Sequence, residues 1–262
     1  MSTIRKNHYV LSRNILLVTT LLILSSTANA GVIEYNGYAD LEFSLVSVTN
    51  QGSGDGPGAG AIRNAISSTG NIIDANTVST GSGTATEVTG LISTDPWAIG
   101  GSFYQSSESF GKAGEAKGTS DAFADTGFSI FIENKFNSAR TFVFSVFSFV
   151  SADVLFNGAL HAFDDGGAYA EIVMYDNGGE FFRSSAEAFL GGSEYEEEYI
   201  ESTVSFTLEA DQSKTISGTV YSEGYAVAVA EPSILYVLCM GLLGLAGLHR
   251  RRPTSNYIKN EF

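Results

Sequence analysis

The feature that most constrains the fold of this 262-residue chain is a strict alternation of apolar residues. Every second residue is apolar at 41–45, 128–132 and 204–208. Polar turns rich in Gly, Asn and Asp separate the segments at 134–139, 164–167, 176–179 and 210–213. A period of two predicts strands that bury one face, and short strands joined by such turns are typical of antiparallel sandwiches. We therefore expect an all-β domain, an antiparallel and jelly-roll-like β-sandwich.

The segment 141–150 is the most apolar of the expected strands. Phe142, Phe144 and Val146 would face one side, and Phe147 and Phe149 the other. Strands with two apolar faces are typical of positions covered on both sides. We expect this strand to be central and buried on each face.

Residues 50–94 lack this alternation and are rich in Gly, Ser and Thr. We expect a long loop or partly disordered insertion here, with a short helix at 61–68. A binding loop is the alternative interpretation.

The N-terminus has the pattern of a secretory signal peptide. A basic region precedes a mainly apolar stretch at 15–24, which is too short for a membrane span. Ala28 and Ala30 have the A-x-A spacing of a cleavage site, which predicts Gly31 as the mature start. Residues 1–30 are therefore expected to be removed, and 31–229 to form the exported domain.

A second targeting segment lies near the C-terminus. Residues 234–248 are uncharged and would form a helix of roughly 22 Å, shorter than the ~30 Å hydrocarbon core. The basic cluster Arg250, Arg251 and Arg252 follows. Because positive residues stay in the cytoplasm, the preceding domain lies outside and 253–262 form a cytoplasmic tail. Topology alone also fits a plain membrane anchor.

Glu231, Pro232 and Ser233 directly precede this apolar run. Together with the helix and the arginines, this pattern resembles the PEP-CTERM sorting signal of Gram-negative bacteria over residues 230–252. The resemblance implies recognition by exosortase, a membrane-embedded cysteine protease, and delivery to the cell surface or biofilm matrix. Ala230 stands where the motif has its first proline, and the tail after the arginines is longer than in many members.

The exported segment is strongly acidic. It holds seven Lys or Arg against 27 Asp or Glu, a net charge of −20. Such a domain repels nucleic acid and other anionic polymers. Its expected partners are signal peptidase and the general export machinery, then exosortase, the membrane through 234–248, and extracellular polysaccharide.

The sequence shows no catalytic constellation. Cys239 lies in the apolar run, and His161 is the only histidine in the exported segment. That excludes disulfides and the usual zinc sets there, and no G-x-S-x-G elbow supports a triad with His161. We therefore expect no catalytic, cofactor or metal site, although the Asp-rich turns at 164–167 and 176–179 offer oxygen ligands for calcium.

Two surface features remain. The acidic run 194–199 is expected to be a solvated loop or an edge strand whose charges prevent pairing, with a cation contact as the alternative. Trp97, Phe103 and Tyr104 could stack on sugars, but core packing is the commoner role of such residues. The leading hypothesis is a non-enzymatic surface or matrix protein, and the alternative is a carbohydrate-binding module or carbohydrate-active enzyme.

Overall fold

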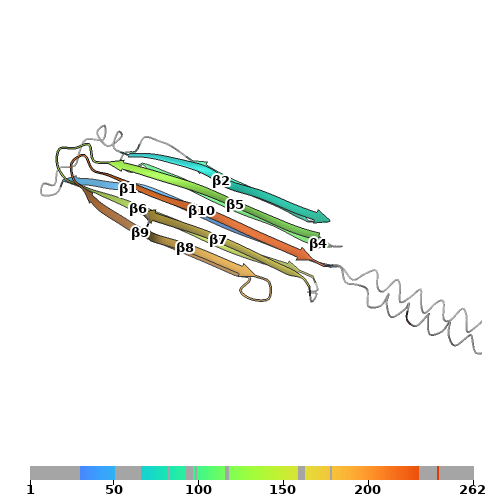
Figure 1. Cartoon of the computed structure of the whole chain (residues 1–262). Helices are drawn as coiled ribbons and strands as arrows, with labels where there is room; N and C mark the ends of the chain where they lie inside the picture. Colours follow the sequence, from blue (N-terminus) through green and yellow to red (C-terminus); the bar gives the residue numbers. More distant parts are fainter. Residues whose placement is uncertain are drawn as a thin grey trace, which may run out of the picture. The chain divides into compact units, whose positions relative to one another are not determined.

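The computed structural model describes residues 30–50, 66–81, 83–92, 97, 99–115, 118–158, 163–177, 179–229 and 241. Within 30–229 every regular element that it describes is a β-strand (Figure 1). The strands are β1 (Ala30–Asn50), β2 (Ile66–Gly81), β3 (Thr84–Ile92), β4 (Ser102–Glu115), β5 (Gly118–Glu133), β6 (Arg140–Asn157), β7 (Asp165–Asp176), β8 (Gly179–Phe189), β9 (Tyr195–Leu208) and β10 (Ser213–Ala228).

The strands form two five-stranded antiparallel sheets. Sheet A has the order β3-β4-β1-β6-β9, and sheet B the order β2-β5-β10-β7-β8. The buried side chains of both sheets form one hydrophobic cluster, so the two sheets pack face to face. The expected all-β antiparallel sandwich is confirmed.

The chain is wound so that successive strand pairs alternate between the sheets. β3 pairs with β4 in sheet A, β2 with β5 in sheet B, and β1 with β6 in sheet A. The same nesting recurs as β7 pairs with β8, β6 with β9, and β5 with β10. Residues far apart in sequence therefore lie side by side in each sheet.

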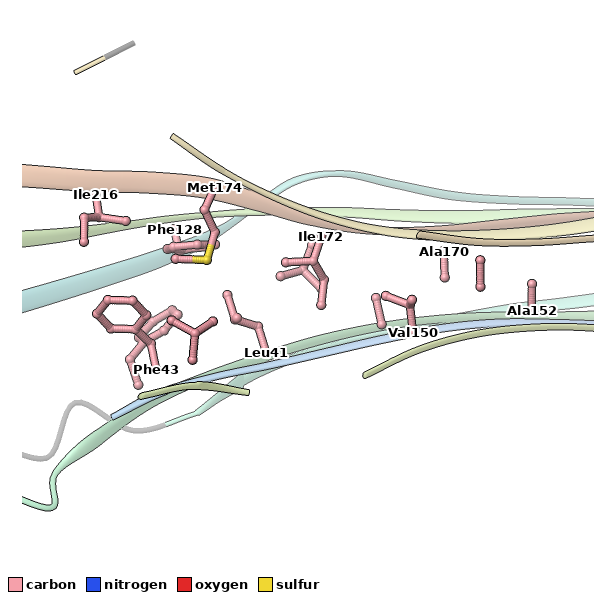
Figure 2. Close-up of a cluster of buried hydrophobic side chains, with 14 of the residues drawn as sticks. Leu41, Phe43, Phe128, Val150, Ala152, Ala170, Ile172, Met174 and Ile216 are labelled. Atoms are coloured by element: carbon pink, nitrogen blue, oxygen red, sulfur yellow. The ribbon is translucent and has the colours of Figure 1, made fainter. Parts of the chain in front are cut away.

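The core tapers along the strands. Phe43 stacks on Phe144 at 4.7 Å between ring centroids, and Trp97 meets both rings edge-on. Figure 2 shows the sheets drawing together from the Phe43 and Ile216 end towards Ala152 and Ala170. Small residues fill the narrow part because the space between the sheets is too thin for larger ones.

Both ends of the domain lie at one end of the sandwich. Ala30 pairs with Glu115, and Ala228 pairs with Gly118, three residues further along the chain. The backbone N–H of Val229 donates to Asp164 Oδ1 at 3.0 Å, which fixes the chain just after β10.

Most predicted strands and turns are confirmed. Leu41, Phe43 and Leu45 are fully buried, as are Ile130 and Ile132. The turns at 134–139, 176–179 and 210–213 separate strands as expected. The turn predicted at 164–167 is wrong at three of its four residues, because β7 already begins at Asp165.

The expectation for residues 50–94 is wrong where the structure describes them. Residues 66–81 and 84–92 form β2 and β3, so no helix occupies 66–68. Both are edge strands, and most β2 side chains are exposed. Their weak apolar alternation follows from that position, because an edge strand is held by backbone hydrogen bonds to one neighbour and few of its side chains enter the core.

The expectation for 141–150 is half right. Phe142, Phe144 and Val146 of β6 are fully buried, whereas Phe147 and Phe149 lie on the opposite face and are only partly buried. No described strand covers that outer face of sheet A.

The predicted membrane helix at 234–248 lies outside the described residues, except for Gly241, which is helical. A search for a helix with the length and hydropathy of a membrane span finds none within the described part of the chain.

Candidate functional site

The strand registers bring aromatic and acidic side chains together on the outer face of sheet A. This face is formed by alternate residues of β1, β4, β6 and β9, whose other residues enter the core. Asn36 of β1 lies opposite Phe110 of β4 and Asp153 of β6, and Asp153 lies opposite Tyr195 of β9. Residues from four separate parts of the sequence thus form one transverse row.

Aromatic rings cover much of this face. Tyr38 lies 6.0 Å from Phe149, and Phe147 meets Tyr199 edge-on at 4.9 Å, both between ring centroids. Tyr199 and Tyr195 are 58% and 55% exposed, far more than core aromatics. These cross-strand pairs stabilise the sheet and also leave ring faces accessible to solvent.

Carboxylates surround the rings. On the described strands, alternation places seven on this outer face: Glu34, Asp40, Glu42, Glu108, Asp153, Glu197 and Glu201. Lys112, opposite Glu34, is the one cation that the same registers place there. The face is therefore strongly negative.

Part of this face is hollowed into a groove of about 500 Å³ across β3, β4, β1 and β6. Its walls include Glu34, Asn36, Glu108, Phe110, Asp153 and Leu155. Phe110 and Leu155 are 40% and 57% exposed and supply an apolar platform. The Oδ1 atom of Asn36, a residue of the groove wall, is buried and has no hydrogen-bond partner.

Two carboxyl groups of this face, Asp153 and Asp40, hold their protons more readily than isolated carboxyls. Burial raises the pKa of Asp153, and the charge of nearby Glu194 raises it further. Burial also raises the pKa of Asp40, against hydrogen bonds with Tyr104 and Tyr38 that lower it. In both groups burial is the largest cause of the raised pKa, and a neighbouring carboxylate adds to it.

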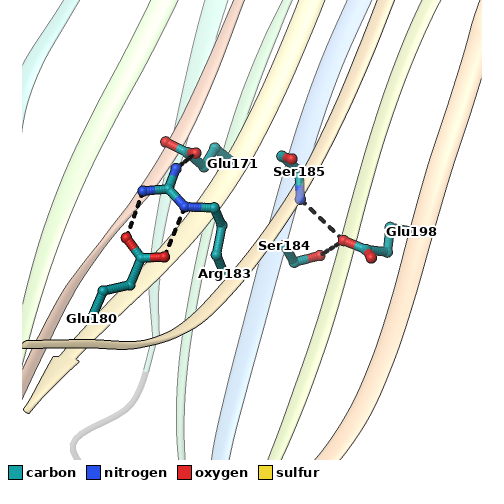
Figure 3. Close-up of polar contacts among 6 residues, drawn as sticks. All are labelled: Glu171, Glu180, Arg183, Ser184, Ser185 and Glu198. Atoms are coloured by element: carbon teal, nitrogen blue, oxygen red, sulfur yellow. Dashed lines mark hydrogen bonds and ion pairs between the residues drawn. The ribbon is translucent and has the colours of Figure 1, made fainter.

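The outer face of sheet B is also acidic, and part of its negative charge is paired within the protein. Figure 3 shows that Arg183 donates two hydrogen bonds to the carboxylate of Glu180, at 3.0 Å from Nε and 2.7 Å from Nη2. Arg183 also forms an ion pair with Glu171. The hollow on this face, between Tyr169, Phe189 and Tyr225, measures only about 90 Å³. The groove of sheet A is therefore the better candidate for a ligand site.

The expected core packing holds for two of the three aromatics that were also considered as a sugar platform. Trp97 and Phe103 are 3% and 2% exposed and belong to the core, where Trp97 Nε1 donates to Ser68 Oγ at 3.2 Å. Tyr104 lies on the outer face of sheet A instead. Core packing therefore separates the three aromatics.

The acidic run 194–199 lies largely on an edge strand, as predicted. Glu196 and Glu198 of β9 reach across to β8 of the other sheet, where they accept hydrogen bonds from the backbone N–H groups of Glu187 and Ser185. Ser184 Oγ also donates to Glu198 at 2.8 Å (Figure 3). These carboxylates cap the open edge of sheet B, a role that the sequence did not predict.

The Asp-rich turns that offered calcium ligands are engaged in protein contacts. Asp164 accepts from Val229, Asp165 Oδ1 accepts from the Gly166 N–H at 2.9 Å, and Asp176 pairs with Lys214. Within the described ranges, no group of three or more His, Cys, Asp or Glu side chains could hold a metal ion.

The remaining predicted sites lie mostly outside the described residues. This holds for Ala28, His161, the motif Glu231, Pro232 and Ser233, and the cluster Arg250, Arg251 and Arg252. Ala30 and Gly31, at the predicted cleavage site, are the first residues of β1.

Neither a protein-family model nor a curated protein matches this chain. A search of solved structures finds a faint likeness to the secreted serine protease VesC from Vibrio cholerae, with 9% identity and a TM-score of 0.11. The match covers 76% of this chain and 48% of that protein, and a TM-score this low carries no argument about fold or function.

Proposed function

We propose that this chain is an exported cell-surface or extracellular-matrix protein that exosortase sorts through its C-terminal signal. The β-sandwich would be the delivered domain, with 1–30 as signal peptide and 234–248 as a short transmembrane helix. The observation that carries the proposal is the sequence of motif, apolar run and arginines at 231–252. The structure supports it because β10 ends at Ala228, so the motif follows the last strand almost directly.

The proposal is tested by the fate of the chain in cells with and without exosortase. We expect full-length, membrane-bound chain to accumulate without exosortase, and a shorter product to appear at the surface or in the medium when it is present. The double variant Glu231→Ala, Pro232→Ala should block this maturation, as measured by intact mass. Glu261→Ala with Pro253→Ala changes the same residue types beyond the arginines and should mature normally. Identical mass and fractionation in both strains would refute the sorting proposal.

The delivered domain has a finer topology consistent with the jelly-roll-like class. Its nested strand pairs alternate between the two sheets, which is the winding of a jelly roll extended over ten strands. We propose this as its classification.

A second candidate function is carbohydrate binding, and the groove on the outer face of sheet A favours it. An open groove with exposed aromatic and aliphatic walls suits the C–H faces of pyranose rings, and surrounding acceptors suit hydroxyl donors. The test is a glycan array probed with the full chain in non-ionic detergent, with and without calcium. Saturable binding to a polysaccharide would support this function. Absence of binding to every glycan would refute it, and only the sorting proposal would remain.

A further inference from the structure

The groove of sheet A carries chemistry that narrows its ligand. We propose that it binds a cationic amino-sugar polymer, with ammonium groups held by Glu34, Glu108 and Asp153 and sugar rings packed on Phe110 and Leu155. This inference deepens the carbohydrate-binding candidate and rests on it.

The polar atoms of the groove select for a ligand rich in hydrogen-bond donors. Its three carboxylates are acceptors alone, and the Oδ1 of Asn36 has no partner. The side chains of Lys112 and Thr84 and the amide nitrogen of Asn36 are able to donate, and the Tyr35 hydroxyl is hydrogen-bonded to Ser120. Carboxylates form their strongest hydrogen bonds with charged donors. A neutral or anionic polysaccharide would leave this negative charge uncompensated.

The position of the groove favours a sugar over a basic peptide. Extended peptides bind sheets mainly by adding a strand to an exposed edge, where backbone groups are unpaired. The groove begins at the edge strand β3, but its three carboxylates lie on β1, β4 and β6, and each of these strands has paired neighbours on both sides. Recognition must therefore come from side chains, and the exposed ring of Phe110 offers a flat surface for both C–H and ammonium groups.

The charges on the rest of the face extend the site beyond one sugar. Towards β9, the rings of Tyr195 and Tyr199 alternate with Glu197 and Glu201 along the strand. The same pairing of ring and carboxylate thus continues across sheet A. A polymer with an ammonium group on each sugar could place successive ammonium groups at successive carboxylates of this face.

Titration calorimetry of the full chain in non-ionic detergent tests the proposal. The probes are a fully deacetylated β-1,4-glucosamine oligomer, its N-acetylated counterpart of equal length, and a lysine homopeptide of equal charge. We expect the deacetylated oligomer to bind at least ~10-fold more tightly than the acetylated one, because acetylation removes the charge-assisted contacts. Raised ionic strength should weaken the binding.

Two groove variants and a matched control locate the site. Glu108→Gln with Asp153→Asn removes two charges without changing shape and should weaken glucosamine binding at least ~10-fold. Phe110→Ala should also weaken glucosamine binding, although it leaves the charge of the groove unchanged. Glu209→Gln with Asp211→Asn removes two charges from the β9–β10 turn and should bind as the unmodified chain does. Thermal melting of each variant confirms that it is folded.

Each outcome separates the proposals. Equal binding of acetylated and deacetylated oligomers would overturn the cationic ligand while carbohydrate binding stood. Lysine homopeptide binding that matches the oligomer and is unaffected by Phe110→Ala would replace the sugar with a basic peptide. Absence of binding to all three probes would overturn the groove proposal, and the sorting proposal would still be decided by its own maturation assay.

Discussion

Gly37 of β1 faces the backbone of the opposing sheet closely. A Cβ atom added there would lie 2.7 Å from the carbonyl oxygen of Tyr169 and 2.8 Å from that of Glu223, both in the opposing backbone. Because backbone cannot move aside as a side chain can, Gly37→Ala must push the sheets apart. We expect a loss of about 1–3 kcal/mol in the free energy of unfolding, measured by chemical denaturation. Gly179→Ala is the control, since its Cβ would meet only Asp176 O at 3.6 Å. Equal effects of the two changes would contradict this account.

Buried serines in the same region differ in what their hydroxyls do. Ser120 Oγ donates to Thr84 O at 2.5 Å and lies 3.0 Å from the Tyr35 hydroxyl, which leaves Tyr35 as donor in that second contact. Ser148 is equally buried, but its hydroxyl has no partner. Ser120→Ala should therefore cost about 1–3 kcal/mol, whereas Ser148→Ala should be neutral or stabilising. Thermal melting of the two variants side by side checks the order, and a larger loss at Ser148 would disprove it.

At the scale of single elements, carboxylates of β9 cover the unpaired backbone edge of β8. The double variant Glu196→Ala, Glu198→Ala leaves the backbone N–H groups of Ser185 and Glu187 without acceptors at an open edge. We expect faster amide hydrogen exchange at these two residues and a larger apparent mass in sedimentation, because unpaired edges invite association. Glu201→Ala removes one negative charge from the outward-facing side of β9 and should change neither the exchange nor the apparent mass. Unchanged exchange in the double variant would show that the carboxylates do not cap the edge.

The elements also show which parts of the fold a sequence pattern can predict. Strands β5 and β10 have regular alternation because one face of each lies in the core, so their positions were predictable. β2 was not, since most of its side chains are exposed and its pairing with β5 leaves no apolar row. Phe147 and Phe149 were expected to be buried because hydropathy does not distinguish core from a solvent-facing aromatic cluster. Their true neighbours, Tyr199 and Tyr38, come from other strands.

The groove depends on the same long-range information. More than seventy residues separate Asn36 from Phe110, and more than forty separate Phe110 from Asp153. Only the sheet register brings these three residues into one row. The proposed sorting motif is the opposite case, because a contiguous stretch of sequence carries the whole pattern. A pattern of that kind can be recognised in a single sequence, whereas the groove becomes visible only once the strands are paired.

At the scale of the whole molecule, excess negative charge should make stability depend on pH in an unusual direction. Burial raises the pKa of Asp121 and Asp125, and nearby Glu223 and Asp74 raise these values further. A carboxyl whose pKa is raised on folding binds its proton more tightly in the folded state. These groups therefore destabilise the fold at neutral pH, and that penalty is relieved as pH falls through the raised values towards the ordinary carboxyl pKa of about 4.

The melting temperature of the full chain should consequently rise as the pH is lowered from 7 towards about 4, and added salt should raise it at pH 7 by screening the same repulsion. Asp74 and Asp125 lie directly opposite each other on β2 and β5, which makes this pair a defined source of the effect. Asp74→Asn should raise the melting temperature at pH 7 and flatten its dependence on pH. Asp211→Asn, in the turn before β10, removes one charge without relieving such a pair and should leave the slope unchanged. A melting temperature that falls steadily from pH 7 to pH 5 would mean that carboxylates stabilised by folding outweigh these destabilised ones.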